Sequence, residues 1–378
     1  MIQSSWQKPG WAVGLMTGTV LDGNIDVALV ETDGQSIVRP GHYDLIAYDD
    51  GTAQLMMQAL AAALPWQFGP IEPAVFVQAE RQLTLAQSAA VERAVGDAGL
   101  SMQDISVVGF HGQTVLHRPP AAGQVGRTRQ LGDGALMAKT LGVPVVHDFR
   151  RADVEAGGQG APLSAIYHQA LLQHQGFTDS TAVLNIGGVG NLTWTDHGGQ
   201  LIGFDTGPGN APINDFMSHR GLGKMDYNGN LAASGMVDET RLARLLEHPY
   251  LVAPFPKSLD RNAFTYEIAS DLSDADGAAL LTAFTAAAVT CALDLLPRRP
   301  ETLIVCGGGR HNRTLMRELA LRTSIKCKNA DTIGWRGDAI EAECFAYLAA
   351  RSMRRLPISF PTTTGVSQAM TGGVVNLP

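Results

Sequence analysis

The sequence predicts an α/β protein built from a duplicated unit, and three observations support this. Short apolar runs of strand type alternate with longer stretches of helical periodicity, the pattern of an α/β fold with mixed sheets. A strand, a glycine turn and a second strand occur at 11–30 and again at 181–205, about one domain length apart. A third glycine run follows an apolar strand within 301–312.

The strands and helices follow from local periodicity. Strands are expected at 12–16, 25–30, 106–110, 143–146, 182–186 and 303–306. Helices are expected at 52–63, 77–98, 134–141 and 241–246. A last helix over 338–354 would begin at an Asp338 cap and place Ile340, Phe345 and Leu348 along one buried face.

Composition limits the possible function. The 378 residues are 45% hydrophobic and 17% charged, enough for two ordinary domains with cores. The formal net charge of -8 argues against a nucleic-acid or anionic-membrane partner, because both favour a basic face. The apolar stretch 277–296 is rich in alanine and threonine and contains Asp294, which favours a buried helix over a membrane span. The four cysteines form no CxxC pair and the first residues resemble no secretion signal, so we expect a cytoplasmic protein with reduced thiols.

The glycine turns are candidate phosphate sites. A strand that reverses on glycines presents several backbone N–H groups in a small concavity, which suits phosphate oxygens. Two such turns, at Gly18 and at Gly187, could hold one phosphate chain from both sides, although any tight hairpin uses glycine. Gly307, Gly308 and Gly309 would let a flat adenine ring and its ribose approach closely. The sequence contains no G-x-x-x-x-G-K-[ST] motif and no helix-opening G-x-G-x-x-G, so any phosphate site is of the strand–turn–strand kind.

Longer blocks of sequence carry a family resemblance. They are GLMTGTVLDGNID (14–26), HGQT (111–114), DFRRADVEAGGQGAPL (148–163), LNIGGVGNLT (184–193), GFDTGPGN (203–210), CGGGRHN (306–312) and DAIEAECFAYL (338–348). In this order they resemble the 1,6-anhydro-N-acetylmuramic acid kinases of the actin, Hsp70 and sugar-kinase superfamily. The resemblance implies a two-lobed, duplicated ribonuclease H-like fold with an inter-lobe cleft. It assigns 1–148 with 338–378 to the first lobe and 149–337 to the second.

The resemblance also implies a reaction and the residues for it. An anhydro sugar has no free O6 hydroxyl, so water must open the ring while ATP and Mg²⁺ support phosphorylation. Asp205 is the expected general base, and its alternative is a turn cap or a magnesium ligand. Asp22 and Asp26 are candidate magnesium ligands, or simple turn residues. The expected nucleotide contacts are Gly18, Thr19, Leu21, Asp22, Gly23, Gly187, Gly188, Asn191, Gly307, Gly308, Gly309 and Asn312.

Three further residues are expected to contact the sugar. A guanidinium at Arg150 could fork onto the lactyl carboxylate, with a salt bridge to Asp148 or Asp153 as the alternative. Glu341 is expected to face the sugar from the last helix, although such a glutamate is usually solvated. His111 follows a strand and is either a substrate contact or a hydrogen-bonded structural histidine.

The sequence departs from the family pattern in two places. Val20 replaces a serine, with two residues instead of one before Asp26, and Leu259-Asp260 replaces Thr-Gly in the motif P-K-S-T-G-R-E. Another 1,6-anhydro sugar, such as levoglucosan, is therefore an alternative substrate, and a non-metabolic ATPase of the actin or Hsp70 kind is an alternative function. The family suggests a homodimer.

Overall fold

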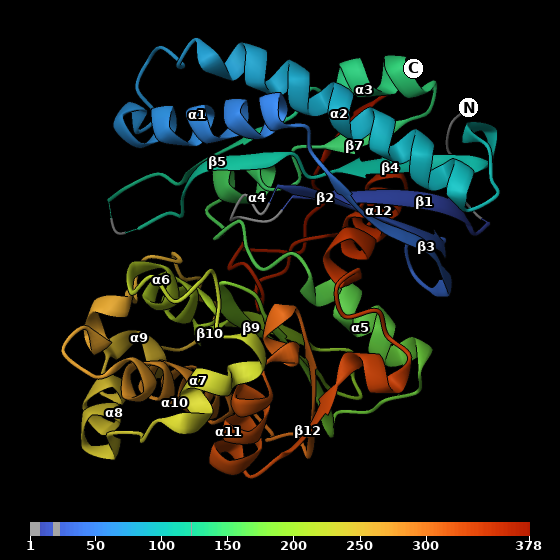
Figure 1. Cartoon of the computed structure of the whole chain (residues 1–378). Coiled ribbons are helices and arrows are strands. Elements are labelled where there is room, and N and C mark those ends of the chain that lie inside the picture. Colours follow the sequence, from blue (N-terminus) through green and yellow to red (C-terminus); the bar gives the residue numbers. More distant parts are fainter. Residues whose placement is uncertain (1–7, 18–22, 122) are drawn as a thin grey trace. The chain divides into compact units, whose positions relative to one another are not determined.

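The computed structural model describes residues 8–17, 23–121 and 123–378, and the chain divides into two compact units (Figure 1). The first unit is Met1–His174 with Glu341–Pro378, and the second is Gln175–Ile340. Each unit is described by itself.

The first unit contains a six-stranded sheet of order β13-β7-β4-β1-β2-β3. Its strands are β1 (Gly10–Met16), β2 (Asn24–Thr32), β3 (Ile37–Ala47), β4 (Ile105–Phe110), β7 (Val145–His147) and β13 (Val374–Asn376). β1, β2 and β3 form an antiparallel meander, while β4 is parallel to both β1 and β7. A separate hairpin consists of β5 (Gln113–Arg118) and β6 (Arg127–Leu131).

The second unit repeats this topology in a five-stranded sheet of order β10-β9-β8-β11-β12. Its strands are β8 (Thr181–Ile186), β9 (Val189–Thr195), β10 (Leu201–Pro208), β11 (Thr302–Cys306) and β12 (Lys326–Asn329). Again the first three strands form an antiparallel meander, and the fourth lies parallel to both the first and the fifth. The order β3-β2-β1-β4-β7 in the first sheet therefore corresponds to β10-β9-β8-β11-β12 in the second, with β13 added at the edge of the first. This correspondence confirms the predicted duplication.

Helices cover both faces of the first sheet. They are α1 (Asp50–Trp66), α2 (Val75–Asp97), α3 (Gly134–Leu141), α4 (Arg151–Glu155), α5 (Ala165–His174) and α12 (Ile340–Met353). Figure 1 shows α1 and α2 over one face and α12 against the other. A Cβ on Gly14 or Gly109 would overlap the carbonyl of Ala342 or Phe345 on α12. The two glycines therefore let α12 approach the sheet backbone closely.

The second unit is built around one buried helix. Its helices are α6 (Ala211–His219), α7 (Asn230–Ser234), α8 (Glu239–Leu246), α9 (Pro249–Val252), α10 (Asp274–Leu293) and α11 (Arg313–Thr323). Short 3₁₀ turns are η2 (Met102–Asp104) in the first unit and η3 (Tyr227–Gly229), η4 (Tyr266–Ala269), η5 (Gly308–His311) and η6 (Ala330–Ile333) in the second. α10 is the one helix in the described residues that is long and apolar enough to span a membrane, and 83% of its apolar window is buried inside the protein. It packs on β9 and β10, in agreement with the buried helix expected from its composition.

Two boundaries differ from those expected from the sequence. The last helix begins at Ile340, and the prediction of an Asp338 cap is wrong because the Asp338 carboxylate accepts hydrogen bonds from the Arg310 guanidinium at 2.7 and 2.6 Å. The sequence placed the second lobe from residue 149, whereas the first unit extends to His174. The Tyr167 hydroxyl on α5 donates to Glu343 on α12 at 2.7 Å, which ties this segment to the first unit.

Candidate functional site

The turn Gly187-Gly188 joins β8 to β9 in the second unit and is fixed by the segment that follows β10. The N–H groups of Gly209 and Ala211 donate to the Gly188 carbonyl at 3.0 and 3.2 Å, and Asn210 N–H donates to the Gly187 carbonyl at 2.8 Å. A Cβ placed on Gly187 would meet no atom nearer than 3.9 Å, apart from those of its two chain neighbours. The carbonyl side of the turn is thus occupied by the protein, while open space lies beside its glycines.

Polar side chains form a row across three neighbouring strands next to this turn. Asn185 on β8 lies opposite Asn191 on β9, which lies opposite Asp205 on β10. Directly paired residues share a face of the sheet, so the three side chains are neighbours. Asn191 Oδ1 and Thr206 Oγ1 are buried and have no hydrogen-bond partner within the described residues. Buried polar atoms are normally paired, so these two are available to a ligand or ion.

Asp205 is held from several directions although only 8% of it is exposed. Its Oδ2 accepts a hydrogen bond from the Leu259 N–H at 2.8 Å, and its carbonyl accepts one from the Tyr250 hydroxyl at 2.9 Å. The Asp205 N–H donates to the Lys257 carbonyl at 3.1 Å. The segment containing Lys257 and Leu259 therefore orients the carboxylate, as a general base requires.

Lys257 is a buried cation near this carboxylate that the sequence analysis did not assign. Its Nζ donates to the carbonyls of Tyr250 and Leu251 at 2.8 and 3.1 Å and lies 4.7 Å from the centre of the Tyr250 ring. Burial lowers the pKa of Lys257 to about 8, and Cys291 and Asp205 oppose this shift. Lys257 is therefore mainly charged at neutral pH and anchors the segment that orients Asp205.

Arg261 is a second cation missed by the sequence analysis. Its Nη2 lies 3.2 Å from Asp215 Oδ1, and its Nε is buried with no hydrogen-bond partner in the described part of the chain. This Nε lies 4.0 Å from the position that a Cβ on Gly188 would occupy. A guanidinium beside a glycine turn is suited to phosphate oxygens.

The three consecutive glycines have different roles. Gly307 has a φ of +72°, and a Cβ there would overlap Asn185 Oδ1, while a Cβ on Gly309 would lie 2.6 Å from Ile186 Cβ. A Cβ on Gly308 would meet only Asn210 Nδ2, at 3.7 Å. Packing against β8 thus accounts for two of the glycines, and Gly308 is the one beside open space.

Asn312, the last expected nucleotide contact, is the N-cap of α11. Its Oδ1 accepts a hydrogen bond from the Leu315 N–H at 2.9 Å, which is an N-cap contact. The structure therefore gives Asn312 a structural task, and a nucleotide contact stays a prediction.

His111 and Arg150 lie together in the first unit. His111 Nδ1 donates to the Gly112 carbonyl at 2.7 Å, so its Nε2 accepts from Arg150 Nε at 3.1 Å. Burial and then Arg150 lower the pKa of His111 to about 3, so the imidazole is neutral. Arg150 Nη1 also donates to the Gly160 carbonyl at 2.7 Å.

The carboxylates that were alternative partners for Arg150 have other contacts. Asp148 pairs with Arg151 at 2.8 Å, and Asp153 accepts a hydrogen bond from the Gly160 N–H at 2.6 Å. The backbone at Gly160 thus connects Asp153 and Arg150, which fixes this part of the first unit.

Glu341 lies in the first turn of α12, in the same region as Arg150. Burial raises the pKa of the Cys344 thiol, Glu341 raises it further, and Arg150 lowers it, so both charged groups lie around Cys344. Glu343, by contrast, is buried and accepts the hydrogen bond from Tyr167. The three expected sugar contacts, His111, Arg150 and Glu341, therefore gather in one region of the first unit.

The first glycine turn is described only in part. Gly18, Thr19, Leu21 and Asp22 lie outside the described residues, so their roles stay predictions. Gly23 has a φ of +89°, and a Cβ there would meet no atom within 4 Å. Asp26 on β2 accepts a hydrogen bond from the Tyr43 hydroxyl at 2.9 Å.

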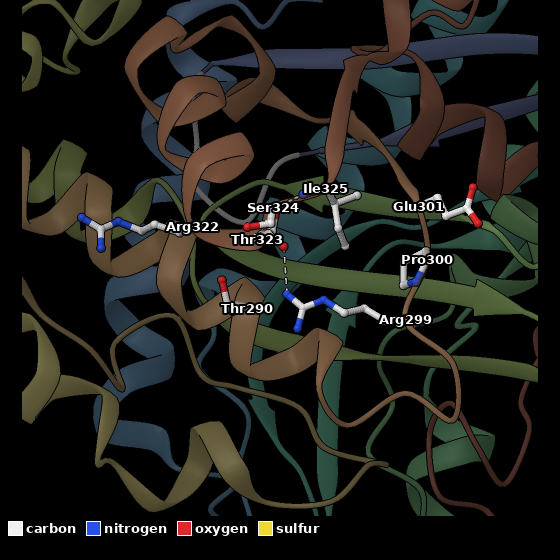
Figure 2. A pocket seen from close by; sticks show the side chains of 8 residues that line it. All are labelled: Thr290, Arg299, Pro300, Glu301, Arg322, Thr323, Ser324 and Ile325. Atoms are coloured by element: carbon white, nitrogen blue, oxygen red, sulfur yellow. Dashed lines mark hydrogen bonds between the residues drawn. The ribbon is translucent and has the colours of Figure 1, made fainter.

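A surface cavity of about 660 Å³ in the second unit lies away from these residues (Figure 2). It is lined by residues just before β11 and β12, including Glu301 and Ile325, whereas Gly187 and Gly307 follow the opposite ends of β8 and β11. Arg299 at its rim donates to the Thr323 carbonyl at 2.9 Å, as the dashed line in Figure 2 shows. The cavity is therefore not part of the candidate site.

The repeated sheets and the glycine turns define the class of protein. Two units of equal strand order constitute the actin-like ATPase fold that sugar kinases share. The sequence profile of the anhydro-N-acetylmuramic acid kinase family matches residues 10–377. The chain therefore belongs to this family, and it is a kinase.

Individual relatives agree with the assignment. A protein of Brucella anthropi with the family's name is 61% identical over 366 residues, covering 97% of this chain and 99% of the relative. One of Rhizobium rhizogenes is 60% identical with the same coverage. A solved structure, component A of (R)-2-hydroxyglutaryl-CoA dehydratase from Acidaminococcus fermentans, covers 91% of this chain and 99% of its own at 12% identity and a TM-score of 0.48. This structural likeness adds nothing to the fold assignment, which depends on the strand order.

Proposed function

We propose that the enzyme uses ATP to convert 1,6-anhydro-N-acetylmuramic acid into N-acetylmuramic acid 6-phosphate. The observation that carries the proposal is the buried Asp205 carboxylate, which accepts a hydrogen bond from the Leu259 N–H. Asp205 lies on β10, in the same row of polar side chains as Asn191 and Asn185. The names of the relatives supply the sugar. Such a reaction belongs to the recycling of cell-wall peptidoglycan.

The second unit has groups that fit the phosphates of ATP. The turn Gly187-Gly188 is open beside its glycines, and the unpaired Nε of Arg261 faces the same region. Gly308, beside open space, suits the adenosine part. These groups bind and orient the phosphate chain, which is most of what phosphoryl transfer demands of a protein.

Asn191 in the second unit also fits a magnesium ion. The Oδ1 of Asn191, which has no hydrogen-bond partner in the described residues, is the type of oxygen ligand that Mg²⁺ accepts. Asp22 and Asp26 are further candidate ligands, proposed from the sequence. Magnesium, when bound, neutralises charge on the phosphates.

In the proposed reaction, Asp205 accepts a proton from a water molecule that attacks C1 of the sugar. The C1–O6 bond breaks as the new C1–O bond forms, and the C1 hydroxyl keeps the second hydrogen of the water. The released O6 attacks the γ-phosphorus, the bond to the β-phosphate oxygen breaks, and ADP leaves. Asp205 then releases its proton to solvent, so the sum is sugar, water and ATP giving sugar 6-phosphate, ADP and a proton.

The first unit provides groups for the sugar. Arg150 is positioned by its bond to His111 and can donate a bidentate pair to the lactyl carboxylate. His111 stays neutral because its pKa is about 3, so it positions Arg150 and carries no charge of its own. Glu341 is the acceptor proposed for sugar hydroxyls.

Isotope labelling tests this proposal. The protein, magnesium-ATP and anhydro-N-acetylmuramic acid are mixed in ¹⁸O-water, and the product is analysed by mass spectrometry and NMR. We expect one ¹⁸O at C1 of a 6-phosphorylated sugar. Levoglucosan, which lacks the lactyl acid, is the control substrate and should react much more slowly. ADP formation without sugar phosphorylation, or faster turnover of levoglucosan, would overturn the assignment.

The proposal extends to where and how the enzyme works. As in the family resemblance, we place it in the cytoplasm and as a homodimer. Light scattering coupled to size-exclusion chromatography tests the dimer, and a mass near that of the 40.1 kDa monomer contradicts it.

A further inference from the structure

A separate group of potential metal ligands lies in the first unit, on β3 and at the end of α2. One ligand atom from each of His42, Asp44 and Asp97 lies within 4.8 Å of the other two. His42 and Asp44 are two positions apart on β3, and Asp97 is the last residue of α2. None of the three belongs to the proposed kinase site.

The backbone of β3 is shaped at this point by a bulge. Ala28 on β2 pairs with Tyr43 on β3, and Val30 on β2 pairs with Pro40 on β3. Between these two pairs, two residues of β3 face a single residue of β2. These two are Gly41 and His42. A Cβ on Gly41 would lie 2.8 Å from Leu29 Cβ and close to the Trp11 ring, so glycine fixes the bulge. Bulges redirect side chains, and this one sets the direction of His42.

The imidazole of His42 has an unused nitrogen. Its Nε2 is buried and has no hydrogen-bond partner among the residues that the structure describes. A buried ring nitrogen without a partner is unfavourable, since it loses its hydrogen bond to water. A metal ion bound to this nitrogen would remove this deficit.

Arg93 is the cation that faces both carboxylates. Its Nη2 lies 3.6 Å from Asp44 Oδ2, its Nε lies 3.5 Å from Asp97 Oδ2, and its side chain is 63% exposed. Long ion pairs of an exposed guanidinium contribute little and exchange readily. Arg93 can therefore move away when a divalent cation binds the two carboxylates.

We propose that His42, Asp44 and Asp97 bind a divalent transition-metal ion of the zinc type, which displaces Arg93. One imidazole nitrogen with two carboxylate oxygens suits Zn²⁺, whereas Mg²⁺ prefers oxygen ligands alone. Zinc ligands lie at about 2.0–2.2 Å, so the three side chains draw together on binding. His42 also lines a surface cavity of about 430 Å³ with Arg39 and Leu100. The bound ion links the edge strand β3 to the end of α2 and stabilises the first unit.

Metal titration tests this site independently of kinase activity. Chelator-treated protein is dialysed against Zn²⁺ in millimolar Mg²⁺, and Co²⁺ is used as a spectroscopic probe through its visible absorption bands. We expect one equivalent of Zn²⁺ per chain and a higher thermal unfolding midpoint with zinc. His42→Ala and Asp97→Asn should weaken binding at least about tenfold and abolish the rise in midpoint. His174→Ala, which removes an exposed histidine at the end of α5, is the matched control and should bind normally.

The Arg93→Ala variant gives the sharpest test. Removing the competing guanidinium should strengthen zinc binding several-fold if the metal replaces Arg93. If Arg93 is instead the resident counter-charge of the two carboxylates, the variant loses stability and gains no affinity. Equal zinc uptake by wild type and His42→Ala, or no uptake by wild type, would also overturn the proposal. Circular dichroism confirms that each variant is folded before it is titrated.

Discussion

Replacement of Asp205 by asparagine separates its proposed chemistry from its structural role. The asparagine side-chain oxygen can still accept the hydrogen bond that Leu259 N–H donates to Asp205 Oδ2 at 2.8 Å. The segment around Leu259 should therefore keep its place, while the base is lost. A positioned general base typically contributes about 10²–10⁴-fold in rate, so kcat should fall by that factor. Affinity for ATP, measured by calorimetry, should change little.

Asp205→Ala and a second buried carboxylate complete the test. Alanine leaves the Leu259 N–H without its acceptor, which should lower the free energy of unfolding by about 1–3 kcal/mol relative to Asp205→Asn. Asp226→Asn is the matched control, because Asp226 is also buried and accepts N–H groups of Leu231 and Ala232 at 2.9 and 3.0 Å. Its kcat should stay near wild type. A kcat above one-tenth of wild type in Asp205→Asn would refute the general-base argument.

Three other perturbations test separate contacts. Arg261→Gln should weaken ADP binding about tenfold, the effect of losing one charge-assisted bond, and leave adenosine binding unchanged; equal loss for both ligands contradicts a phosphate role. Gly307→Ala should lower unfolding free energy by at least about 2 kcal/mol in denaturant, because its φ is +72° and a Cβ overlaps Asn185, whereas Gly308→Ala should be nearly neutral. Burial lowers the pKa of His168 to about 3, so the unfolded chain gains a proton below about 6.5 that the folded chain refuses. His168 should therefore contribute about 1.4 kcal/mol per pH unit to the fall in stability from pH 6.5 towards 3, in addition to the similar contribution of buried His111. His168→Asn should reduce the slope by that amount, and an unchanged slope contradicts the argument.

Regular elements could be predicted from the sequence because their patterns are local. The helix 134–141 and the strand 182–186 coincide with α3 and β8 to within a residue, since capping, burial and β-branching all agree there. β3 was missed because Pro40 and the bulge at Gly41 interrupt the alternation that identifies a strand. The start of α12 was misplaced because Asp338 binds Arg310, a contact that local sequence cannot reveal.

The candidate site shows the same division between local and distant information. The turn at Gly187 and the carboxylate of Asp205 were visible in sequence as glycines and an acid after apolar strands. Lys257 and Arg261 were not assigned, because they reach the site from a segment more than fifty positions after Asp205. The only signal in the sequence was that both residues belong to the family motif P-K-S-T-G-R-E, in which Leu259 and Asp260 replace Thr and Gly.

The segment 256–262 shows why its departure from the family pattern is compatible with the proposed chemistry. Leu259 contacts Asp205 through its backbone N–H, a group that every residue except proline provides. Asp260 Oδ1 accepts the Asn262 N–H at 2.8 Å, so an aspartate turn stands where the family has glycine. We therefore expect Leu259→Thr to keep kcat within about twofold, whereas Leu259→Pro removes the donor and should lower kcat at least about tenfold. Steady-state kinetics and thermal unfolding are measured for both variants. If Leu259→Pro folds and retains full activity, the backbone contact does not orient the base.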